Sequence, residues 1–346
     1  LFRTTDFGES WEPVMDGLPP MGSVNDVIEH PDNTNVLFVG TEHHLFVSTD
    51  AGANWAKMSG IPTTHMDDIL IHPREKDLVI GTHGQSIWVL DDTRPLAEWT
   101  AESAAADAHL FSIRPATIFT YWKDTSYRAQ AEFAGENPVD GAVITYKLGP
   151  GMGDAHLTIA RANGEVVREF LVPNDEGLHR MNWDLRHPVS PLAELEPWEP
   201  FEDEELSRSV EDRGHFVSPG TYTVTLAARG NTVSTTVEVR GDPEMPLTQA
   251  QYEEREAFLS GVQELEAAFA EALGSGGAGG RGGRGRDALE GMSEEERSLL
   301  QHRSNVSGIY RALNGGGVRQ GSLYPPTAAQ RDRVEAARIA LAEFRR

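Results

Sequence analysis

A pattern of eight residues that occurs twice near the start of the chain constrains the fold more than any other feature of the sequence. TTDFGESW at Thr4 to Trp11 returns as STDAGANW at Ser48 to Trp55, with its tryptophan 44 residues further on. The shared residues are Thr4, Asp6, Gly8 and Trp11 in the first copy and Ser48, Asp50, Gly52 and Trp55 in the second. We expect each carboxylate to accept backbone N–H groups of a tight turn, each glycine to supply unusual backbone angles, and each tryptophan to pack under its turn.

The residues around this pattern repeat as well. VIEHPDNTNVLFVGT at Val27 to Thr41 matches ILIHPREKDLVIGT at Ile69 to Thr82, and LFVSTD at Leu45 to Asp50 matches IWVLDD at Ile87 to Asp92. A period of roughly 42 residues with four short strands in each repeat is typical of the blades of a β-propeller. The sequence therefore predicts blades, of which the chain holds one that is nearly complete and parts of two others.

These repeats resemble those of the Asp-box (BNR) propellers, and THGQSIWVLDD at Thr82 to Asp92 resembles the last blade of bacterial sortilin-like, glycosyl-hydrolase-like BNR repeat proteins. Four later segments resemble the Ig-like module that follows the propeller in that family: 133–148, 177–188, 218–226 and 239–243. The resemblance does not imply a reaction, because one fold serves many functions. An acidic chain with more Arg than Lys and no Cys suits an extracytoplasmic protein, either secreted or periplasmic.

The composition excludes several classes of function. The chain has no cysteine, so disulfides, thiol catalysis and thiolate metal sites are not available to it. Its 54 acidic residues outnumber 30 lysines and arginines, and the net charge of −24 should repel nucleic acid and anionic lipid. No apolar run is long enough to span a membrane.

We expect a mainly β chain with a helical end. The predicted parts are terminal blades of an incomplete propeller (1–97), a connector (98–129), an Ig-like β-sandwich (130–243) with an acidic insertion (188–214), and a helical region (244–346) with a flexible Gly/Arg-rich linker (274–286). The blades that would complete the ring are expected upstream in the same protein rather than on a partner. The acidic insertion is interpreted as a solvated loop, with calcium binding a weak alternative because its acids lack an EF-hand spacing.

Alternation with a period of two predicts antiparallel hairpins in the sandwich, with turns at Asn163–Gly164 and Arg229–Asn231. A strand is predicted at Leu110 to Trp122, and four side chains are predicted to face the core: Trp183, Tyr222, Val224 and Leu226. Three helices are predicted: one capped by Thr248 with Phe258, Leu265, Phe269 and Leu273 on one stripe, one at Ser293–Leu313, and one at Thr327–Phe344.

The best candidate site is the face on which the loops around the innermost strands of the blades gather. The predicted ligand-binding residues are Asn25, Asp26, Glu42, His43, His44, Asp67, Asp68 and His83. Opposed carboxylates across a groove could act as acid and base on a glycosidic bond, which makes Asp26, Asp67 and Asp68 weak catalytic candidates. The competing interpretation, which we favour, is that they cap turns or bind without catalysis. No metal site is predicted, because His43 and His44 are adjacent and would face opposite ways on a strand.

Asp6 and Asp50 are rejected as catalysts, because their carboxylates are expected to be used by turn hydrogen bonds. Sialidase chemistry also needs an arginine cluster and a tyrosine nucleophile, and the blades contain only Arg3, Arg74 and Arg94 and no tyrosine.

Three functions remain open at this point. The favoured one is a non-catalytic part that supports the fold and binds a glycan or peptide. The first alternative is part of a glycoside hydrolase of the xyloglucanase or sialidase-like propeller type. The second is a sortilin-like propeller that takes up a peptide as an added strand.

Overall fold

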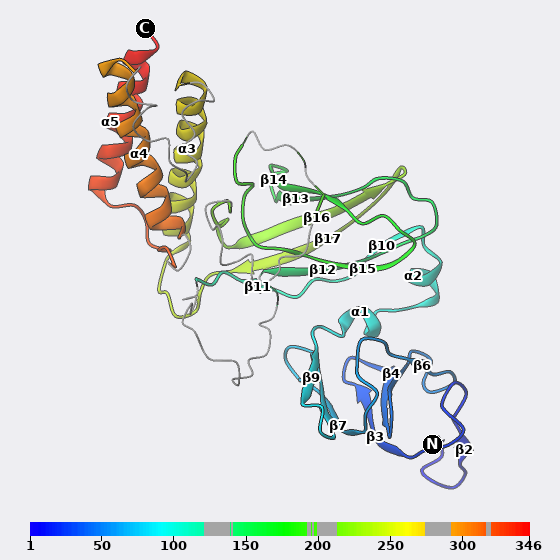
Figure 1. The fold of residues 1–346 in the computed structure, drawn as a ribbon. Coiled ribbons are helices and arrows are strands. Elements are labelled where there is room, and N and C mark those ends of the chain that lie inside the picture. Colours follow the sequence, from blue (N-terminus) through cyan, green and yellow to red (C-terminus); the bar gives the residue numbers. More distant parts are fainter. Residues whose placement is uncertain are drawn as a thin grey trace. The chain divides into compact units, whose positions relative to one another are not determined.

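The computed structural model describes residues 1–120, 139, 141–191, 195, 197–198, 213–273, 292–315 and 320–346. The fold is mainly β, with several sheets and long helices near the C-terminus, as the sequence predicted (Figure 1). The chain divides into two compact units: unit 1 comprises 1–112, 145–150 and 176–179, and unit 2 comprises 113–144, 151–175 and 180–346. The predicted boundaries at residues 97, 129 and 243 stay predictions. Among the described residues, no helix is both long and apolar enough to cross a bilayer.

Unit 1 contains two antiparallel sheets built from the repeated segments. The first sheet has the order β3 (Val24–His30), β4 (Asn33–Thr41), β5 (Leu45–Ser48) and β6 (Ala56–Lys57), and the second has the order β7 (Met66–Ile71), β8 (Leu78–Thr82) and β9 (Ile87–Leu90). A hairpin of β1 (Phe2–Arg3) and β2 (Glu12–Pro13) precedes them, and the short helices α1 (Arg94–Ala97) and α2 (Ala101–Ala105) follow. The strands of both sheets therefore follow one another in sequence order.

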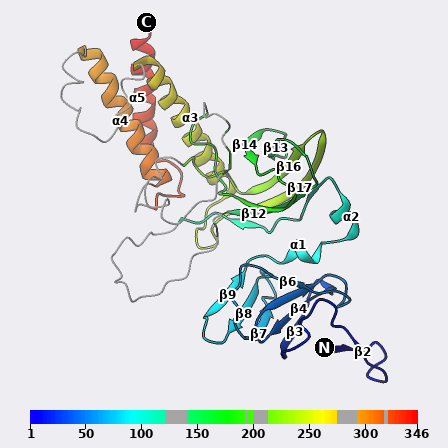
Figure 2. The same cartoon turned by 45° about the vertical axis from the view of Figure 1, so that its right-hand side comes forward.

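The first and second sheets pack face to face over an apolar core within unit 1 (Figure 2). Phe38 and Leu45 of the first sheet are buried with Met66 and Ile69 of the second. The backbones approach most closely at Gly40, where an added Cβ would lie 2.9 Å from the Cβ of Met66. Glycine is needed at this position because any side chain would push the sheets apart.

The two predicted turns form corresponding hydrogen bonds. Asp50 Oδ1 accepts from Asn54 N at 2.8 Å and from Ser48 Oγ at 2.8 Å, and Asp6 Oδ1 accepts from Ser10 N at 2.9 Å and from Thr4 Oγ1 at 2.8 Å. Hydrogen bonds from Ser10, through its hydroxyl and its backbone N–H, and from Thr4 lower the pKa of the exposed Asp6 to about 2. Both carboxylates are thus committed to their turns.

The two tryptophans of the turns differ, although the sequence predicted the same packing for both. Trp55 is 5% exposed, packs with Val39 and Phe46, and donates its indole N–H to Val14 O at 3.1 Å. Trp11 is 61% exposed. The difference arises because Trp55 lies over a four-stranded sheet, whereas Trp11 lies beside a hairpin whose strands are only two residues long.

Two further sheets carry the remaining strands of the described residues. One has the order β10 (Ala108–Leu110), β12 (Ala142–Leu148) and β15 (Gly177–Trp183), and the other has the order β11 (Ala116–Thr117), β17 (Asn231–Arg240), β16 (Gly220–Ala228), β13 (Ala155–Arg161) and β14 (Val166–Val172). The four side chains predicted to face the core are all buried, and the ring centroids of Trp183 and Tyr222 lie 5.3 Å apart. The predicted hairpins are antiparallel, with a tight turn at Arg229 and Gly230.

One detail differs from the prediction. The strand expected at Leu110–Trp122 is two short strands, β10 and β11, and residues beyond 120 lie outside the described part. Pro115, which has no N–H to donate, lies between them. The sequence made no prediction for the pairing of β11, which lies parallel to β17.

From residue 244 on, the described residues form three long helices close to the predicted bounds: α3 (Gln249–Leu273), α4 (Glu294–Asn314) and α5 (Ala328–Phe344). Ser293 and Thr327 cap α4 and α5 in capping boxes, in which the third residue of each helix bonds back to the cap. The predicted stripe of α3 is buried at Leu265 and Phe269 and partly buried at Phe258 and Leu273. The Gly/Arg linker and most of the acidic insertion lie outside the described residues.

A buried carboxylate fastens α3 to the strands of unit 2. Glu256 is 6% exposed and accepts from the side chains of Arg161 and His187 and from both the N–H and the hydroxyl of Ser218, at 3.0 and 2.6 Å. Burial raises the pKa of Glu256, but the hydrogen bonds of His187 and Ser218 and the charges of His187 and Arg161 outweigh burial and lower the pKa to about 2. A paired and fully hydrogen-bonded charge of this kind is costly to break.

We predict that Glu256→Gln lowers the free energy of unfolding of unit 2 by about 3 kcal/mol, because the partly buried Arg161 loses its counter-charge and Ser218 loses a charged acceptor. The measurement is urea denaturation at pH 7, followed by the far-UV circular dichroism of the helices. Glu253→Gln, on the exposed side of the same helix, is the matched control and should change stability by less than about 0.5 kcal/mol. Equal losses of stability from Glu256→Gln and Glu253→Gln would contradict the stabilising role of the Glu256 charge.

The lowered pKa of Glu256 predicts that the folded protein loses stability in acid. The pKa of Glu256 is lower in the folded protein than the model-peptide value of 4.5, so its contribution is complete above about pH 4.5 and is lost as the pH falls from 4.5 towards 2. Stability of the wild-type protein should therefore fall more steeply in this window than that of Glu256→Gln. If the stabilities of the two proteins fell equally with pH in this window, the prediction would be wrong.

Candidate functional site

The candidate site of unit 1 lies where two β-bulges occur at one end of the two sheets. In the pairing of β3 with β4, the register shifts between Val24 and Asp26. In the pairing of β7 with β8, it shifts between Met66 and Asp68. Asn25 is therefore the extra residue of one strand, and Asp67 is that of the other. A bulge bends the strand and redirects a side chain, which is why bulges are frequent at functional sites.

A chain of hydrogen-bonded side chains joins the two bulges, and we name it the polar chain. It consists of Ser23, Asn25, Glu42, His65, Asp67 and His83. Ser23 Oγ lies 3.0 Å from Glu42 Oε1 and 3.0 Å from Asn25 Oδ1.

The second half of the polar chain lies on the second sheet. Asn25 Nδ2 reaches the ring of His65 at 3.2 Å and donates to Met66 O at 3.0 Å, across the two sheets. Asp67 Oδ1 lies 2.6 Å from His65 Nδ1, and Asp67 Oδ2 lies 3.3 Å from His83 Nδ1. The side chains of His65 and Asp67 are each partly exposed, and that of His83 is largely exposed, so a ligand can reach them.

The structure brings four of the predicted residues together in the polar chain: Asn25, Glu42, Asp67 and His83. Sequence reasoning missed Ser23 and His65. The signal was present in the repeat, because SVND at Ser23–Asp26 aligns with HMDD at His65–Asp68. The two missed residues occupy the same position in their repeats.

Asp26 and Asp68 occupy equivalent positions but have different surroundings. Asp26 Oδ1 accepts from Val27 N at 2.8 Å, and its Oδ2 accepts from Ile69 N of the second sheet at 2.8 Å. Both oxygens of Asp26 thus brace the backbone. Asp68 is exposed, and within the described part of the chain no donor is paired with its carboxylate.

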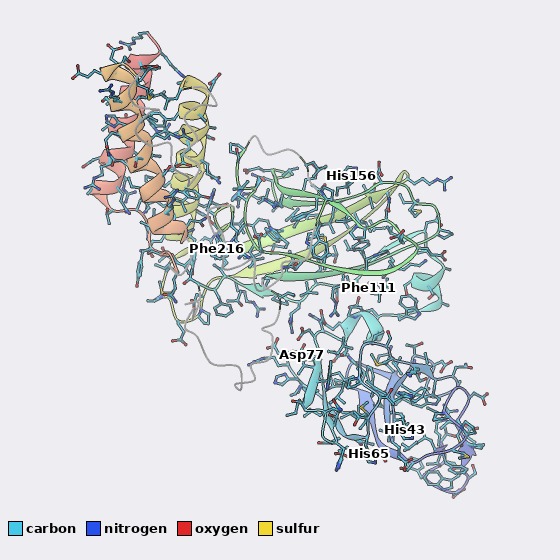
Figure 3. The ribbon with its side chains drawn as sticks, viewed as in Figure 1. His43, His65, Asp77, Phe111, His156 and Phe216 are labelled. Carbon is cyan, nitrogen blue, oxygen red and sulfur yellow. The ribbon has the colours of Figure 1, made fainter. Side chains whose placement is uncertain are left out.

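His43 and His44 lie near the same end of the sheets but outside the polar chain. They occupy the turn between β4 and β5, not a strand as the sequence suggested, and Thr41 Oγ1 accepts from both of their backbone N–H groups. Burial and the nearby charge of Lys57 lower the pKa of His44. Figure 3 shows His43 and His65 at one end of unit 1 and Asp77 at the other.

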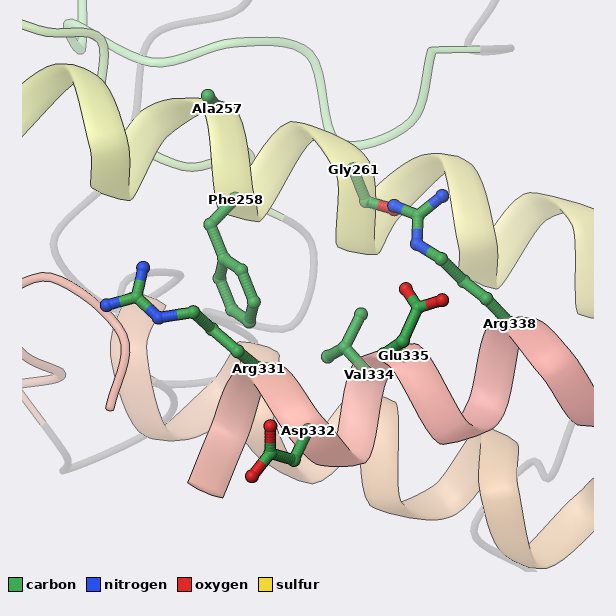
Figure 4. Close-up of a pocket in the computed structure, with 8 residues that line it drawn as sticks. All are labelled: Ala257, Phe258, Gly261, Arg331, Asp332, Val334, Glu335 and Arg338. Atoms are coloured by element: carbon green, nitrogen blue, oxygen red, sulfur yellow. The ribbon is translucent and has the colours of Figure 1, made fainter. Parts of the chain in front are cut away.

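Among the described residues, no group of three or more His, Asp or Glu side chains is arranged to hold a metal ion. In unit 2, a groove of about 290 Å³ lies between α3 and α5 (Figure 4). Arg331 at its edge pairs with Glu254, and Arg338 donates to Gly261 O. These arginines already have protein partners, so the polar chain is the stronger candidate.

Comparison with known proteins does not identify a family. No protein-family model matches the chain, and no curated protein matches it. One similar solved structure is the extracellular domain of a B. thetaiotaomicron protein described as a one component system, with 10% identity, 70% of this chain covered and a TM-score of 0.23. Another is the BSP domain of a biofilm associated protein, with 12% identity, 66% coverage and a TM-score of 0.18. This chain spans 28% and 26% of those chains.

We predict that Asp26→Ala speeds hydrogen exchange of the Ile69 amide about tenfold, because that N–H loses its acceptor. The measurement is amide exchange in the segment Met66–Ile71. Asp68→Ala is the matched control at the equivalent position and should leave exchange of Ile69 unchanged. A response of Ile69 to both substitutions would show that Asp26 is not a specific brace.

Proposed function

We propose that the chain is a non-catalytic part of an extracytoplasmic Asp-box propeller protein, in which the polar chain binds a glycan or a peptide. The first and second sheets are interpreted as successive blades, and the sheets of β10–β17 as an Ig-like sandwich. The turns at Asp6 and Asp50, with their matching hydrogen bonds, support this interpretation. The proposed extracytoplasmic location rests on the composition of the chain, which is acidic, free of Cys and richer in Arg than in Lys.

The observation that carries the proposal is the partly exposed run of hydrogen-bonding side chains from Glu42 to His83. The carboxylates of Glu42 and Asp67 can accept hydrogen bonds from hydroxyl or N–H groups, and an imidazole can donate or accept. Sugar hydroxyls and peptide N–H groups are ligands of this chemistry. The polar chain holds these groups in fixed positions before the ligand arrives, which reduces the cost of binding.

Binding fits the geometry better than hydrolysis does. A glycoside hydrolase needs two carboxyl groups that can exchange protons or attack the sugar. Asp26 uses both oxygens on backbone N–H groups, and Asp67 lies between two imidazoles. Of the three candidate carboxylates only Asp68 is then left, and one carboxylate does not make the pair. We therefore propose a site that holds its ligand without cleaving it.

The test is to screen the full chain against glycan and peptide libraries and to measure the best ligand by calorimetry. Asp67→Asn and His83→Ala should each weaken binding at least tenfold, because a good hydrogen bond to a charged group contributes about 1.5–3 kcal/mol. Asp32→Asn, beyond the far end of β3, is the matched control and should bind normally. Binding that is unaffected by both site variants, or turnover of a bound glycan, would contradict the proposal.

A further inference from the structure

A buried pair of histidines lies against α3, beside the contact that Glu256 makes. His215 is 1% exposed, and its ring stacks on that of His187, with 4.5 Å between the ring centroids. The backbone N–H of His187 donates to His215 O at 3.0 Å, so the two segments that carry these rings lie side by side. His187 has a charged partner in Glu256, and His215 faces a hydroxyl instead.

The two ring nitrogens of His215 have different surroundings. Nε2 lies 3.1 Å from the hydroxyl of Ser260 on α3. Nδ1 is buried and has no hydrogen-bond partner among the described residues. In a neutral ring only one nitrogen carries a proton, and the hydroxyl of Ser260 can accept that proton. A charged ring carries a proton on both nitrogens, so protonation would bury an N–H group that has no acceptor.

The groups that face His215 also oppose a positive charge on its ring. Arg186, which follows β15, and Arg255 of α3 are both buried cations. Tyr310 of α4 meets the ring edge to face with 6.3 Å between the centroids, and burial raises the pKa of this phenol, so it stays neutral. Burial lowers the pKa of His215 well below its usual value of 6.5, and the charges of His187, Arg255 and Arg186 lower it further.

Glu256 attracts a proton to His215 through its charge, but its oxygens are already occupied. One oxygen accepts from Arg161 and His187, and the other accepts from the N–H and the hydroxyl of Ser218. An ionised carboxylate has about four positions for hydrogen bonds, and these four donors use them. Glu256 therefore cannot bond to a second proton on His215 while α3 stays in place.

His215 belongs to a short segment, 214–218, that bonds to two of the long helices. Gly214 O accepts from Asn314 Nδ2 at the end of α4 at 3.3 Å, and Ser218 bonds to the carboxylate of α3. Because these contacts lie so close together in the chain, moving the ring of His215 into water loosens the hold of the whole segment on the helices.

We propose that this contact is pH-sensitive: uptake of one proton by His215 releases α3 from the strands of unit 2 in mildly acidic solution. The proton comes from water and binds the unprotonated nitrogen of the ring, which then moves out to water, where both N–H groups find acceptors. His187 can donate to Glu256 whether or not it is charged, so it does not force the release. The inference concerns unit 2 and does not depend on the ligand of the polar chain.

The linkage between protonation and opening sets the pH window. Because the pKa of His215 is lower in the folded protein than in the open state, its contribution to stability is complete above about pH 6.5 and is lost as the pH falls below 6.5. Uptake of one proton on opening raises the equilibrium constant for opening about tenfold for each pH unit in that range. Glu256 adds its own loss only below about pH 4.5.

The test is amide hydrogen exchange of the full chain between pH 7.5 and pH 4.5, expressed as protection factors. The protection of the α3 amides from Arg255 to Gln263 should be constant above about pH 7 and should fall about tenfold for each pH unit below pH 6. Protection of these amides that does not change over the whole range would overturn the proposal.

Variants then assign the response to one residue. His215→Gln and His215→Phe remove the titrating group, and each should abolish the fall in protection between pH 6.5 and pH 4.5. His302→Gln replaces a partly exposed histidine of α4 and is the matched control, which should keep the pH dependence of the wild type. A fall that persists in both variants of His215 would assign the response to another group and overturn the proposal.

A second measurement leaves the buried site unchanged. In the wild-type protein, NMR of the imidazole carbons should show a neutral His215 ring for as long as the α3 amides are protected. The signals of a charged ring should appear only together with the loss of that protection. A charged His215 ring in a protein whose α3 amides remain protected would overturn the proposal.

Discussion

The packing of the first sheet on the second is the constraint on which the candidate site depends. The apolar faces that the two sheets turn towards each other are removed from water when the sheets pack together. Phe38 and Leu45 pack on Met66, and Gly40 lets the backbones come close enough. The two bulges then lie side by side, and the polar chain can cross from one sheet to the other.

In unit 2, a buried polar contact joins the helix α3 to the strands. The long helix α3 contributes both an apolar stripe to the helical core and a single carboxylate to the strands. Glu256 is buried among Arg161, His187 and Ser218. The helical end is thereby attached to the strands of unit 2 by a specific polar contact.

Much of the architecture could be predicted because its signals are local. The turns at Asp6 and Asp50 and the caps at Ser293 and Thr327 each depend on residues within a few positions of one another, so their chemistry is visible in the sequence. The polar chain was predicted only in part. His65 enters it through Asn25, which is 40 positions away, and no short pattern records that contact.

The sequence by itself determined the repeat, the turns, the alternation of the strands and the starts of the helices, because each results from interactions between near neighbours. Only the tertiary structure decided which of two equivalent residues serves which role. Asp26 braces a neighbouring sheet while Asp68 is exposed, and Trp55 is buried while Trp11 is not. The two residues of each pair are of the same type. They differ because another sheet packs beside only one of them, and the local sequence pattern does not encode such a long-range contact.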